Sequence, residues 1–416
     1  MSLTKELTDR GFINQFSGES LEAVLDGDTK RTVYLGIDPT ADAIHVGNLV
    51  PYMLLNHLMR AGHNVILLMG GGTALIGDPS GKDSEREFVD AKVVKERAQK
   101  MEANIRKLAI NGKVTFVNNY DWLSKLLMVE FLRDVGKHFT VNAMMKKESV
   151  ARRLESEQGI SFTEFSYALL QGYDFYHLYV HHGCTLQIGG SDQWGNIISG
   201  VDYIRRVAGE EVYGLTMPLI VDKATGKKFG KSEGNAVWLN PEKTSPYAFY
   251  QFWLNTPDES VIDYLKLFTL LPLDEIAAIE AEFRASPETR SAQKKLADEV
   301  TTFVHGEKEQ QASEKVSRLL FEGTGTDLDN VEQEMLFANA PGIQVDDVTT
   351  LSTLLVESGL ATSMREAKTF IESGAIELNG VRIEKDVTVD PKQSTKSYAV
   401  LKRGKKNVCI LKYTPL

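Results

Sequence analysis

The chain has 416 residues and a formal net charge of −10. This length predicts two or three domains with an ample core. The two cysteines, Cys184 and Cys409, exclude a disulfide framework and fit a reducing cytoplasm. The acidic balance argues against a wholly basic nucleic-acid binder. The first residues mix charges without a long apolar run, so we expect no signal peptide, no membrane span and a cytoplasmic location.

Strand-like and helix-like segments alternate in the first half of the chain. Apolar runs predict strands at 32–37, 64–69, 114–117, 184–188 and 215–221. Helical periodicity predicts helices at 47–61, 85–110, 163–181 and 192–207. This alternation predicts an α/β fold with a parallel sheet and ligands at the carboxyl ends of its strands.

The second half has a different organisation. Residues 247–320 read as helices separated by Pro257, Pro272 and Pro287, and 324–348 reads as a linker with some helix. Two short helices ending at Gly359 and Gly374 and strands joined by a turn at Asn379-Gly380 are then expected. Residues 351–416 carry a net charge of +4 and the other 350 carry −14, which suggests a separate role for the tail.

Two segments far apart in the sequence carry charge chemistry. His45 and Gly47 stand where strand 32–37 gives way to a helix, and a helix N-terminus offers unpaired N–H groups to an anion. Segment 227–232, Lys-Lys-Phe-Gly-Lys-Ser, adds three lysines and a hydroxyl beside a glycine. Alone, each is usually ordinary surface. Together they predict a polyphosphate site whose lysines act in the transition state.

Segment 77–82, Gly-Asp-Pro-Ser-Gly-Lys, is not a Walker P-loop. That motif needs glycine at the position of Ile76 and serine or threonine at that of Asp83. The glycine triplet 70–72 fails as a dinucleotide fingerprint because Leu75 stands where a glycine is required. A glycine turn after a strand would explain both glycine clusters, although not the charges of the first.

Segment 161–174 places a phenol, an amide and a carboxylate on one helix face. Tyr167, Gln171 and Asp174 stand at i, i+4 and i+7. A solvated stripe would have the same spacing, but the apolar neighbours favour the polar wall of a pocket.

Segment 187–196, Gln-Ile-Gly-Gly-Ser-Asp-Gln-Trp-Gly-Asn, follows a predicted strand. Its glycines admit a ligand close to the backbone, and Asp192 can accept from ribose hydroxyls or cap the next helix. A nucleophile elbow is excluded, since it would need glycine at Gln193. His181-His182-Gly183-Cys184 lacks a second cluster, so zinc is not expected.

These segments together resemble the bacterial-type tyrosyl-tRNA synthetases, a family of class I aminoacyl-tRNA synthetases. The His45 segment resembles the HIGH signature, with Asn48 in place of its second histidine, and 228–232 resembles KMSKS. The tail, through 363–368 and 374–380, resembles the RNA-binding module of a small-subunit ribosomal protein. The resemblance runs from about residue 3 to 413 and is weakest between 324 and 348.

The resemblance implies roles for individual residues. Expected catalytic residues are Thr40, His45, Asn48, Lys82, Arg86, Lys228, Lys231 and Ser232. Expected tyrosine-binding residues are Asp78, Tyr167 and Gln171 at the amino group, Asp174 and Tyr34 at the phenol, and Gln187. Expected ATP-binding residues are Gly36, Asp38, Gly47, Gly190, Asp192 and Lys231. Expected RNA-binding residues are Arg365, Lys368, Arg403, Lys405 and Lys406.

The resemblance also implies an organisation and partners. The expected domains are a Rossmann-like catalytic domain (1–226), a lysine loop and connection (227–246), an α-helical anticodon-binding domain (247–322), a linker (323–348) and a small α+β RNA-binding domain (349–416). The expected partners are L-tyrosine, ATP, the tRNA for tyrosine and a second copy of the chain through 131–162. Mg²⁺ should accompany ATP, with no protein-chelated metal.

The expected reaction is tyrosine activation by ATP followed by transfer to the terminal adenosine of the tRNA. Three alternatives remain open: a tryptophan-specific relative, a small nucleotidyltransferase, and a non-enzymatic RNA-binding protein of the same fold. The pair Tyr34 and Asp174 argues against the first. The helical part and basic tail argue against the second, and the lysine loop against the third.

Overall fold

The computed structural model describes residues 1–81, 89–108, 112–156, 159–220, 229, 231–232, 235–322, 327–394, 396–404 and 407–413. The chain forms two compact units. The first comprises Met1–Thr244 and Thr256–Leu296, and the second comprises Ser245–Asn255 and Ala297–Leu416.

A six-stranded sheet in the order β1-β6-β5-β2-β3-β4 lies at the centre of the first unit. Its strands are β1 (Gln15–Phe16), β2 (Thr32–Ile37), β3 (Asn64–Met69), β4 (Val114–Asn118), β5 (Cys184–Gly190) and β6 (Tyr213–Met217). All neighbours pair in parallel except β1, which is antiparallel to β6. Strands β3 and β4 follow β2 on one side, whereas β5 and β6 lie on its other side, so the strand order reverses between β2 and β5. Open α/β sheets bind ligands at such a reversal.

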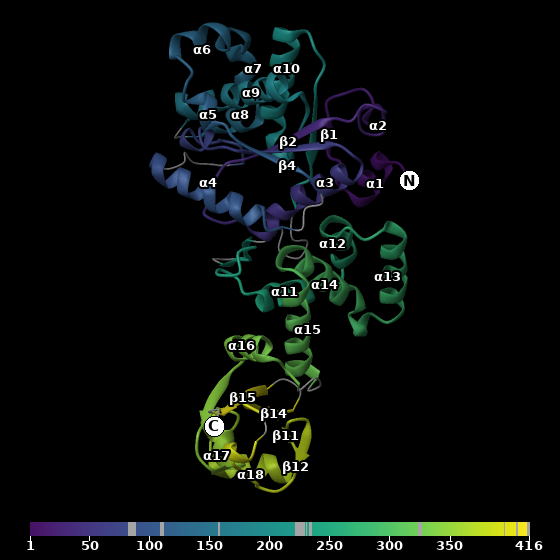
Figure 1. Ribbon diagram of the computed structural model, residues 1–416, viewed down its shortest axis with the longest axis vertical. Coiled ribbons are helices and arrows are strands. Elements are labelled where there is room, and N and C mark those ends of the chain that lie inside the picture. Colours follow the sequence, from purple (N-terminus) through teal and green to yellow (C-terminus); the bar gives the residue numbers. More distant parts are fainter. Residues whose placement is uncertain are drawn as a thin grey trace. The chain divides into compact units, whose positions relative to one another are not determined.

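Four helices cover the two faces of this sheet. Helices α9 (Phe162–His182) and α10 (Trp194–Ala208) lie on one face, and α3 (Leu49–Arg60) and α4 (Ala91–Ile105) lie on the other (Figure 1). Val33, Leu67 and Leu186 of the central strands are at most 1% exposed. Burial on both faces explains why these strands read as continuous apolar runs.

The predicted elements of this unit are present, and two of them, α4 and β6, have a boundary that differs by more than two residues from the prediction. Of the predicted helix 85–110, residues 85–88 and 109–110 lie outside the described residues. Helix α4 spans Ala91–Ile105, and Asp90 caps its start by accepting the Lys92 N–H. Strand β6 spans Tyr213–Met217 and not 215–221, because Pro218 follows and has no N–H for a ladder. Strand β1 was not predicted, because two residues carry no periodic pattern.

Short helices fill the region between β4 and α9. They are α5 (Tyr120–Leu123), α6 (Met128–Asp134), the 3₁₀ turn η3 (Gly136–His138), α7 (Val141–Met145) and α8 (Glu148–Leu154). Arg153 of α8 and Glu164 of α9 form an ion pair of 2.8 Å, and both side chains are at most 2% exposed. Removing one partner of such a buried pair would leave an uncompensated charge, so a change at Arg153 or Glu164 affects both α8 and the start of α9.

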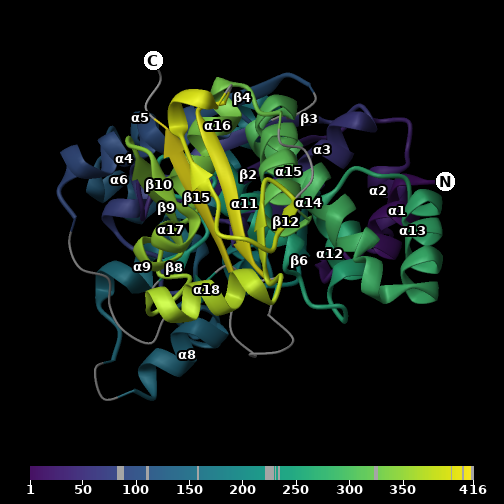
Figure 2. The same ribbon diagram turned by 90° about the horizontal axis from the view of Figure 1, so that it is seen from below.

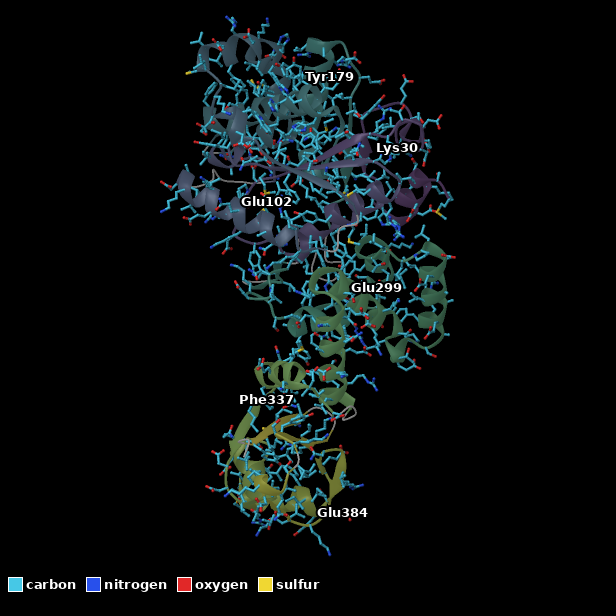
Figure 3. The ribbon with its side chains drawn as sticks, in the orientation of Figure 1. Lys30, Glu102, Tyr179, Glu299, Phe337 and Glu384 are labelled. Atoms are coloured by element: carbon cyan, nitrogen blue, oxygen red, sulfur yellow. The ribbon has the colours of Figure 1, made fainter. Side chains whose placement is uncertain are left out.

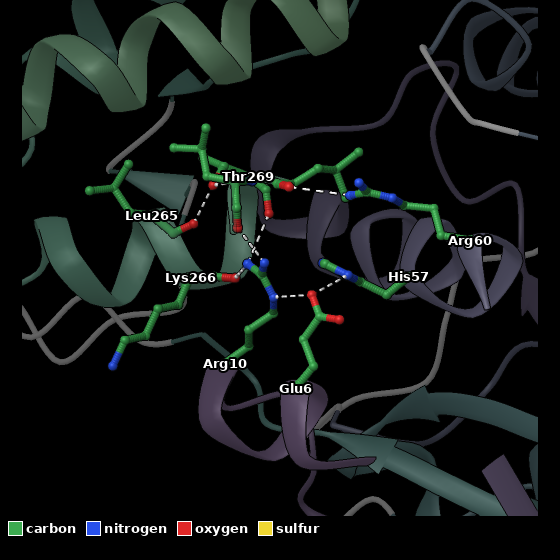
Figure 4. A network of polar contacts seen from close by, with 9 residues as sticks. Glu6, Arg10, His57, Arg60, Leu265, Lys266 and Thr269 are labelled. Carbon is green, nitrogen blue, oxygen red and sulfur yellow. Dashed lines mark hydrogen bonds and ion pairs between the residues drawn. The ribbon is translucent and has the colours of Figure 1, made fainter. Parts of the chain in front are cut away.

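A polar cluster joins the N-terminal helices to a later helix of the same unit. The helices concerned are α1 (Leu3–Arg10), α2 (Leu21–Leu25), α12 (Val261–Phe268) and α13 (Leu273–Ala285). Arg10 donates to the carbonyl of Thr269 at 3.3 Å and to that of Leu271, just beyond α12 (Figure 4). Glu6 accepts from Arg10 at 3.0 Å and contacts His57 of α3 at 3.2 Å. Carbonyls at and beyond a helix end need such donors, so Arg10 holds the end of α12 beside α1 and α3.

The second unit combines helices with a small sheet. Its helices are α11 (Pro246–Leu254), α15 (Glu307–Glu322), α16 (Asn330–Asn339), α17 (Leu351–Glu357) and α18 (Met364–Glu372), and α14 (Ser291–His305) crosses the boundary between the units. The sheet has the order β12-β11-β14-β15-β9, with β9 (Gly342–Val345), β11 (Ile376–Leu378), β12 (Val381–Ile383), β14 (Tyr398–Arg403) and β15 (Asn407–Tyr413). Figure 2 shows β14 and β15 as long neighbouring strands. A two-stranded ladder joins β10 (Thr349–Thr350) to β13 (Thr388–Val389).

The stretch 323–348 contributes more structure than a linker. It contains α16 and β9, and β9 pairs in parallel with β15. Phe337 of α16, labelled in Figure 3, packs its ring 6.1 Å from that of Tyr398 on β14. Tyr398, Val400 and Ile410 share one buried cluster with residues of α15 and α16. The predicted domain boundaries stay a prediction.

The predicted turn at Asn379-Gly380 joins β11 to β12. Both residues have positive φ, 51° and 78°, as a two-residue hairpin of this type requires. In the described part of the chain, no helix has the length and apolar composition needed to cross a bilayer.

Candidate active site

A cavity of about 300 Å³ lies at the point where the strand order reverses, and we call it the first cavity. It is lined by Gly36 and Asp38 from the end of β2 and by Gly189 and Gly190 from the end of β5. All six residues expected to bind tyrosine line it: Tyr34, Asp78, Tyr167, Gln171, Asp174 and Gln187. The helical spacing on α9 and the register of β2 and β5 bring five of them together, and Asp78 comes from the segment that follows β3.

Tyr34 and Gln187 lie side by side in the floor of the first cavity. They are register partners on the parallel strands β2 and β5, and each is at most 2% exposed. Among the described residues, neither the Tyr34 hydroxyl nor Gln187 Oε1 has a hydrogen-bond partner. A buried polar atom without a partner costs free energy, so the cavity is suited to a ligand that brings polar groups to this floor.

Asp174 presents a buried carboxylate to the same cavity. Trp122 Nε1 donates to its Oδ1 at 2.7 Å, and Asn119 Nδ2 donates to its Oδ2 at 2.8 Å. Burial raises the pKa of Asp174 to about 7, and the two donated hydrogen bonds limit that rise. Burial and the nearby Asp174 also raise the pKa of Tyr34 well above its ordinary value, so this phenol stays protonated.

Tyr167 connects the α9 wall to the end of β2. Its hydroxyl donates to Asp38 Oδ2 at 2.8 Å, and Thr73 donates to Asp38 Oδ1 at 2.7 Å. A Cβ on Gly70 would lie 1.9 Å from Asp38 Oδ1, so this position of the glycine triplet has no room for a side chain beside the carboxylate. Packing beside the Asp38 carboxylate therefore explains the glycine at this position.

Asp78 is held by side chains from the start of α10. Gln193 Nε2 donates to its Oδ2 at 2.7 Å, and Asn196 Nδ2 donates to its Oδ1 at 3.2 Å. The backbone N–H of Ser80 also donates to Oδ1, at 3.0 Å. Asp78 is 7% exposed and keeps its carboxylate at the cavity wall, where a cation could pair with it.

The His45 segment forms a 3₁₀ turn, η1 (Val46–Asn48), directly before α3. The Gly47 N–H donates to His45 Nδ1 at 3.1 Å, so a neutral ring carries its hydrogen on Nε2, where it can donate to an anion. The backbone N–H of His45 donates to Asn48 Oδ1 at 3.4 Å. A Cβ on Gly47 would lie 2.6 Å from the Phe229 carbonyl oxygen, so a side chain is excluded there.

Two backbone hydrogen bonds join the segment around His45 to the residues that follow the lysine loop. The Val46 N–H donates to the Val237 carbonyl and the Leu239 N–H to the Ile44 carbonyl, both at 2.9 Å. The segment that follows the lysine loop is therefore fixed beside the segment that contains His45. Near it, β7 (Lys231–Ser232) pairs with β8 (Asn235–Ala236).

A second cavity of about 260 Å³ adjoins the first and shares Asn48 and Gly190 with it. His45, Gly47 and Asp192 also line it, so most of the expected ATP residues lie around these two cavities. Thr40 lies at the rim of the first cavity, and its carbonyl accepts from Arg97 at 3.3 Å.

Several expected residues lie outside the described part of the chain: Lys82, Arg86, Lys228, Lys405 and Lys406. For Lys231 and Ser232 the structure describes the backbone alone. In the second unit, Arg365 and Lys368 are exposed on α18, whereas Arg403 donates to the Leu360 carbonyl at 2.6 Å and lies 4.8 Å from the Phe370 ring centroid. The roles expected of all these residues stay predictions.

Sequence reasoning missed the residues that hold the carboxylates in place. Asn119 and Trp122 support Asp174, Thr73 supports Asp38, and Gln193 and Asn196 support Asp78. The last two were visible in segment 187–196 without a role. The others carry no local signal, because their partners lie 35 to 55 positions away.

Comparison with known proteins agrees with this geometry. Residues 27–322 match the family of "tRNA synthetases class I (W and Y)", and 332–411 match the C-terminal domain of Tyrosine–tRNA ligase SYY-like proteins. The Tyrosine–tRNA ligase of Limosilactobacillus fermentum is 46% identical over 99% of both chains, and that of Geobacillus kaustophilus is 47% identical over 99% of this chain and all of its own.

Solved structures extend the comparison. A C-terminally truncated mitochondrial tyrosyl-tRNA synthetase from Aspergillus nidulans superimposes with a TM-score of 0.70 at 33% identity, covering 77% of this chain and 94% of its own. A tryptophanyl-tRNA synthetase from Encephalitozoon cuniculi, at 14% identity and a TM-score of 0.56 over 74% of this chain and 87% of its own, shows the fold alone. The predicted family and fold are confirmed: this chain belongs to the class I tRNA synthetases of the W and Y family.

Proposed function

We propose that this protein is a tyrosine–tRNA ligase. The observation that carries the proposal is the floor of the first cavity, where the buried Tyr34 hydroxyl lacks a partner among the described residues and the Asp174 carboxylate lies nearby. A substrate phenol can donate to Asp174 and accept from Tyr34, which gives the buried Tyr34 hydroxyl a partner. A substrate without a hydroxyl leaves them unpaired, and this is a strong source of discrimination.

The amino group of the substrate would lie beside the Asp78 carboxylate, at the wall of the first cavity. Asp78, Tyr167 and Gln171 line the wall of the same cavity and suit an ammonium group. This arrangement leaves the amino-acid carboxylate directed toward the second cavity, where ATP would bind. The carboxylate attacks the α-phosphate, an acyl–phosphate bond forms, and the bond to pyrophosphate breaks.

Transfer is the second step. A ribose hydroxyl of the terminal adenosine of the tRNA attacks the adenylate carbonyl and releases AMP. A third cavity of about 850 Å³ shares Asp192 with the second and is lined by Lys146, Lys147, Arg152 and Trp194. Cationic and aromatic side chains together suit a single-stranded RNA end, so we assign this cavity to the acceptor end.

The nucleotide part of the proposal rests on the His45 segment and the loop lysines. The Nε2 hydrogen of His45 suits a phosphate oxygen, and the backbone of Gly47 and Gly190 lines the same cavity. Lys82, Arg86, Lys228 and Lys231 would neutralise the pyrophosphate. Mg²⁺ would enter with ATP, and the protein would act in the cytoplasm.

Amino-acid-dependent exchange of pyrophosphate into ATP tests the activity against its rivals. Tyrosine should support exchange and tryptophan should not. Tyr34→Phe should lower the preference for tyrosine over phenylalanine by roughly tenfold, the worth of one hydrogen bond. Unchanged preference would remove Tyr34 from the site, and exchange with tryptophan would favour the tryptophan-specific relative.

We also propose that the chain is a homodimer. Large apolar side chains of α6 and the start of α9 face solvent in the single chain: Met128 is 76% exposed, Val129 77% and Phe162 75%. Such a group of exposed apolar side chains is typical of a protein interface. Sedimentation should give a dimer, and Val129→Asp with Phe162→Asp should give a monomer. A parent protein that sediments as a monomer would reject this part.

A further inference from the structure

The Trp122 indole is in contact with two residues of α9. Its Nε1 donates to Asp174 Oδ1 at 2.7 Å, and its ring stacks on the His177 imidazole with centroids 4.2 Å apart and an interplanar angle of 16°. Asp174 and His177 are three positions apart on one helix, so they project from the same face. Asp174 accepts the hydrogen bond from the indole N–H, and His177 stacks on the face of the indole ring.

The two donors to Asp174 are supported differently. Asn119 is fixed by polar contacts, since its Oδ1 accepts the Gly72 N–H at 2.7 Å and its Nδ2 also reaches Thr73 Oγ1 at 2.9 Å. Trp122 belongs to α5, which has four residues and no side-chain cap. Its indole is partly buried against a hydrophobic cluster, and the His177 stack adds a contact with defined orientation.

The imidazole is suited to this position. Burial, together with His181 and His182, lowers the pKa of His177 to about 4, so the ring is neutral near pH 7. A neutral aromatic ring can stack on an indole without a desolvated charge. The His181 ring centroid lies 4.3 Å from that of His177, and the His181 side chain is exposed.

We propose that His177 is a positioning residue for amino-acid selection, holding the Trp122 indole so that its N–H stays on Asp174. This rests on the proposed function, since Asp174 is the group that would receive the substrate phenol. His177 does not line the first cavity and acts through Trp122.

The kinetic test is pyrophosphate exchange with three variants. His177→Ala should raise the KM for tyrosine by about fivefold to tenfold, the worth of one aromatic pair, while the KM for ATP and kcat stay within about twofold. His177→Phe keeps a ring and should restore the KM for tyrosine. His181→Ala is the matched control and should match the parent protein.

The possible results distinguish a failure of the His177 proposal from a failure of the proposed function. An unchanged KM for tyrosine in His177→Ala, or equal losses for tyrosine and ATP with a lowered melting temperature, would overturn the proposal. So would a failure of His177→Phe to restore binding. If the parent protein shows no tyrosine-dependent exchange, the proposed function fails, and the stack is judged by a second measurement.

That measurement is the indole ¹⁵N–¹H spectrum of the full chain, which has four tryptophans. The Trp122 signal is assigned with Trp122→Phe. His177→Ala should shift or broaden that signal and leave the other three in place, and His177→Phe should keep it near the parent position. A Trp122 signal that ignores His177→Ala would show that the stack does not hold the indole.

Discussion

The Tyr167 hydroxyl donates to Asp38 Oδ2 across 2.8 Å and joins residues 129 positions apart in the chain. Tyr167 belongs to the α9 wall of the first cavity, and Asp38 stands just after β2, next to the signature segment. The proposed amino-acid and nucleotide sites therefore share one hydrogen bond. Burial and the neighbouring Asp38 and Asp78 raise the pKa of Tyr167 well above its ordinary value, which keeps the phenol a donor.

Removing this hydroxyl should affect both substrates. Tyr167→Phe takes one donor from Asp38, and we expect the KM for tyrosine to rise by roughly tenfold and the KM for ATP by a smaller factor. Pyrophosphate exchange with each substrate varied in turn measures both. Tyr176→Phe on the same helix is the control. An unchanged KM for ATP would show that Asp38 keeps its position without Tyr167.

Asp174 should lower stability as the pH rises. Its folded-state pKa of about 7 lies above the ordinary 3.8, so the folded protein holds this proton more tightly than the unfolded chain does. Between pH 5 and pH 8, the unfolding free energy of Asp174→Asn should therefore rise relative to that of the parent by about 2 to 3 kcal/mol. Urea unfolding at several pH values measures this difference.

The exposed Asp134 provides the control for that experiment. Arg133 lowers the pKa of Asp134, so Asp134→Asn should show no gain over the parent with rising pH. A pH-independent difference for Asp174→Asn would mean that Asp174 titrates near its ordinary pKa. Asp174→Asn should also lose tyrosine-dependent exchange, because the carboxylate that accepts the hydrogen bond of the substrate phenol is gone.

Lys231 should act on the transition state and not on tyrosine binding. Lys231→Ala should lower the rate of activation by ~10²-fold or more and leave the affinity for tyrosine nearly intact. Single-turnover adenylate formation and equilibrium tyrosine binding measure the two quantities. Lys30→Ala, in an exposed position between α2 and β2, is the control. An equal loss in tyrosine binding would contradict the assignment.

The tail is best tested by charge and not by deletion. A chain stopped near Val348 would be expected to make adenylate without charging tRNA. However, that deletion removes β15, the partner of β9, together with Tyr398, Val400 and Ile410 from a shared core. The double variant Arg365→Glu with Lys368→Glu changes two exposed residues of α18 and leaves that core intact.

This double variant should form adenylate normally and bind tRNA more weakly. The dependence of log affinity on log salt should become shallower by ~0.7 to 0.9 for each phosphate that is no longer neutralised. Lys308→Glu on α15 is the control for net charge. Parent-like charging by the double variant would show that these two residues form only a solvated face.

The sequence by itself predicted the main strands and helices of the first unit and a polar face on one of those helices. Strands 32–37 and 64–69 were predicted to the residue, because strands buried on both faces are continuous apolar runs. The spacing of Tyr167, Gln171 and Asp174 predicted a shared helix face, and all three line one cavity. Periodicity and spacing are local properties, so a single chain records them directly.

Only the tertiary structure decided what holds the carboxylates and how the strands are ordered. The pairing of β2 with β5 makes Tyr34 and Gln187 neighbours, although they lie far apart in the chain. Trp122 comes from a four-residue helix, and β9 comes from a stretch that reads as a linker, so neither carries a pattern long enough to recognise. Their roles arise when the chain brings distant segments together, because hydrogen bonds and stacking depend on geometry that sequence distance does not encode.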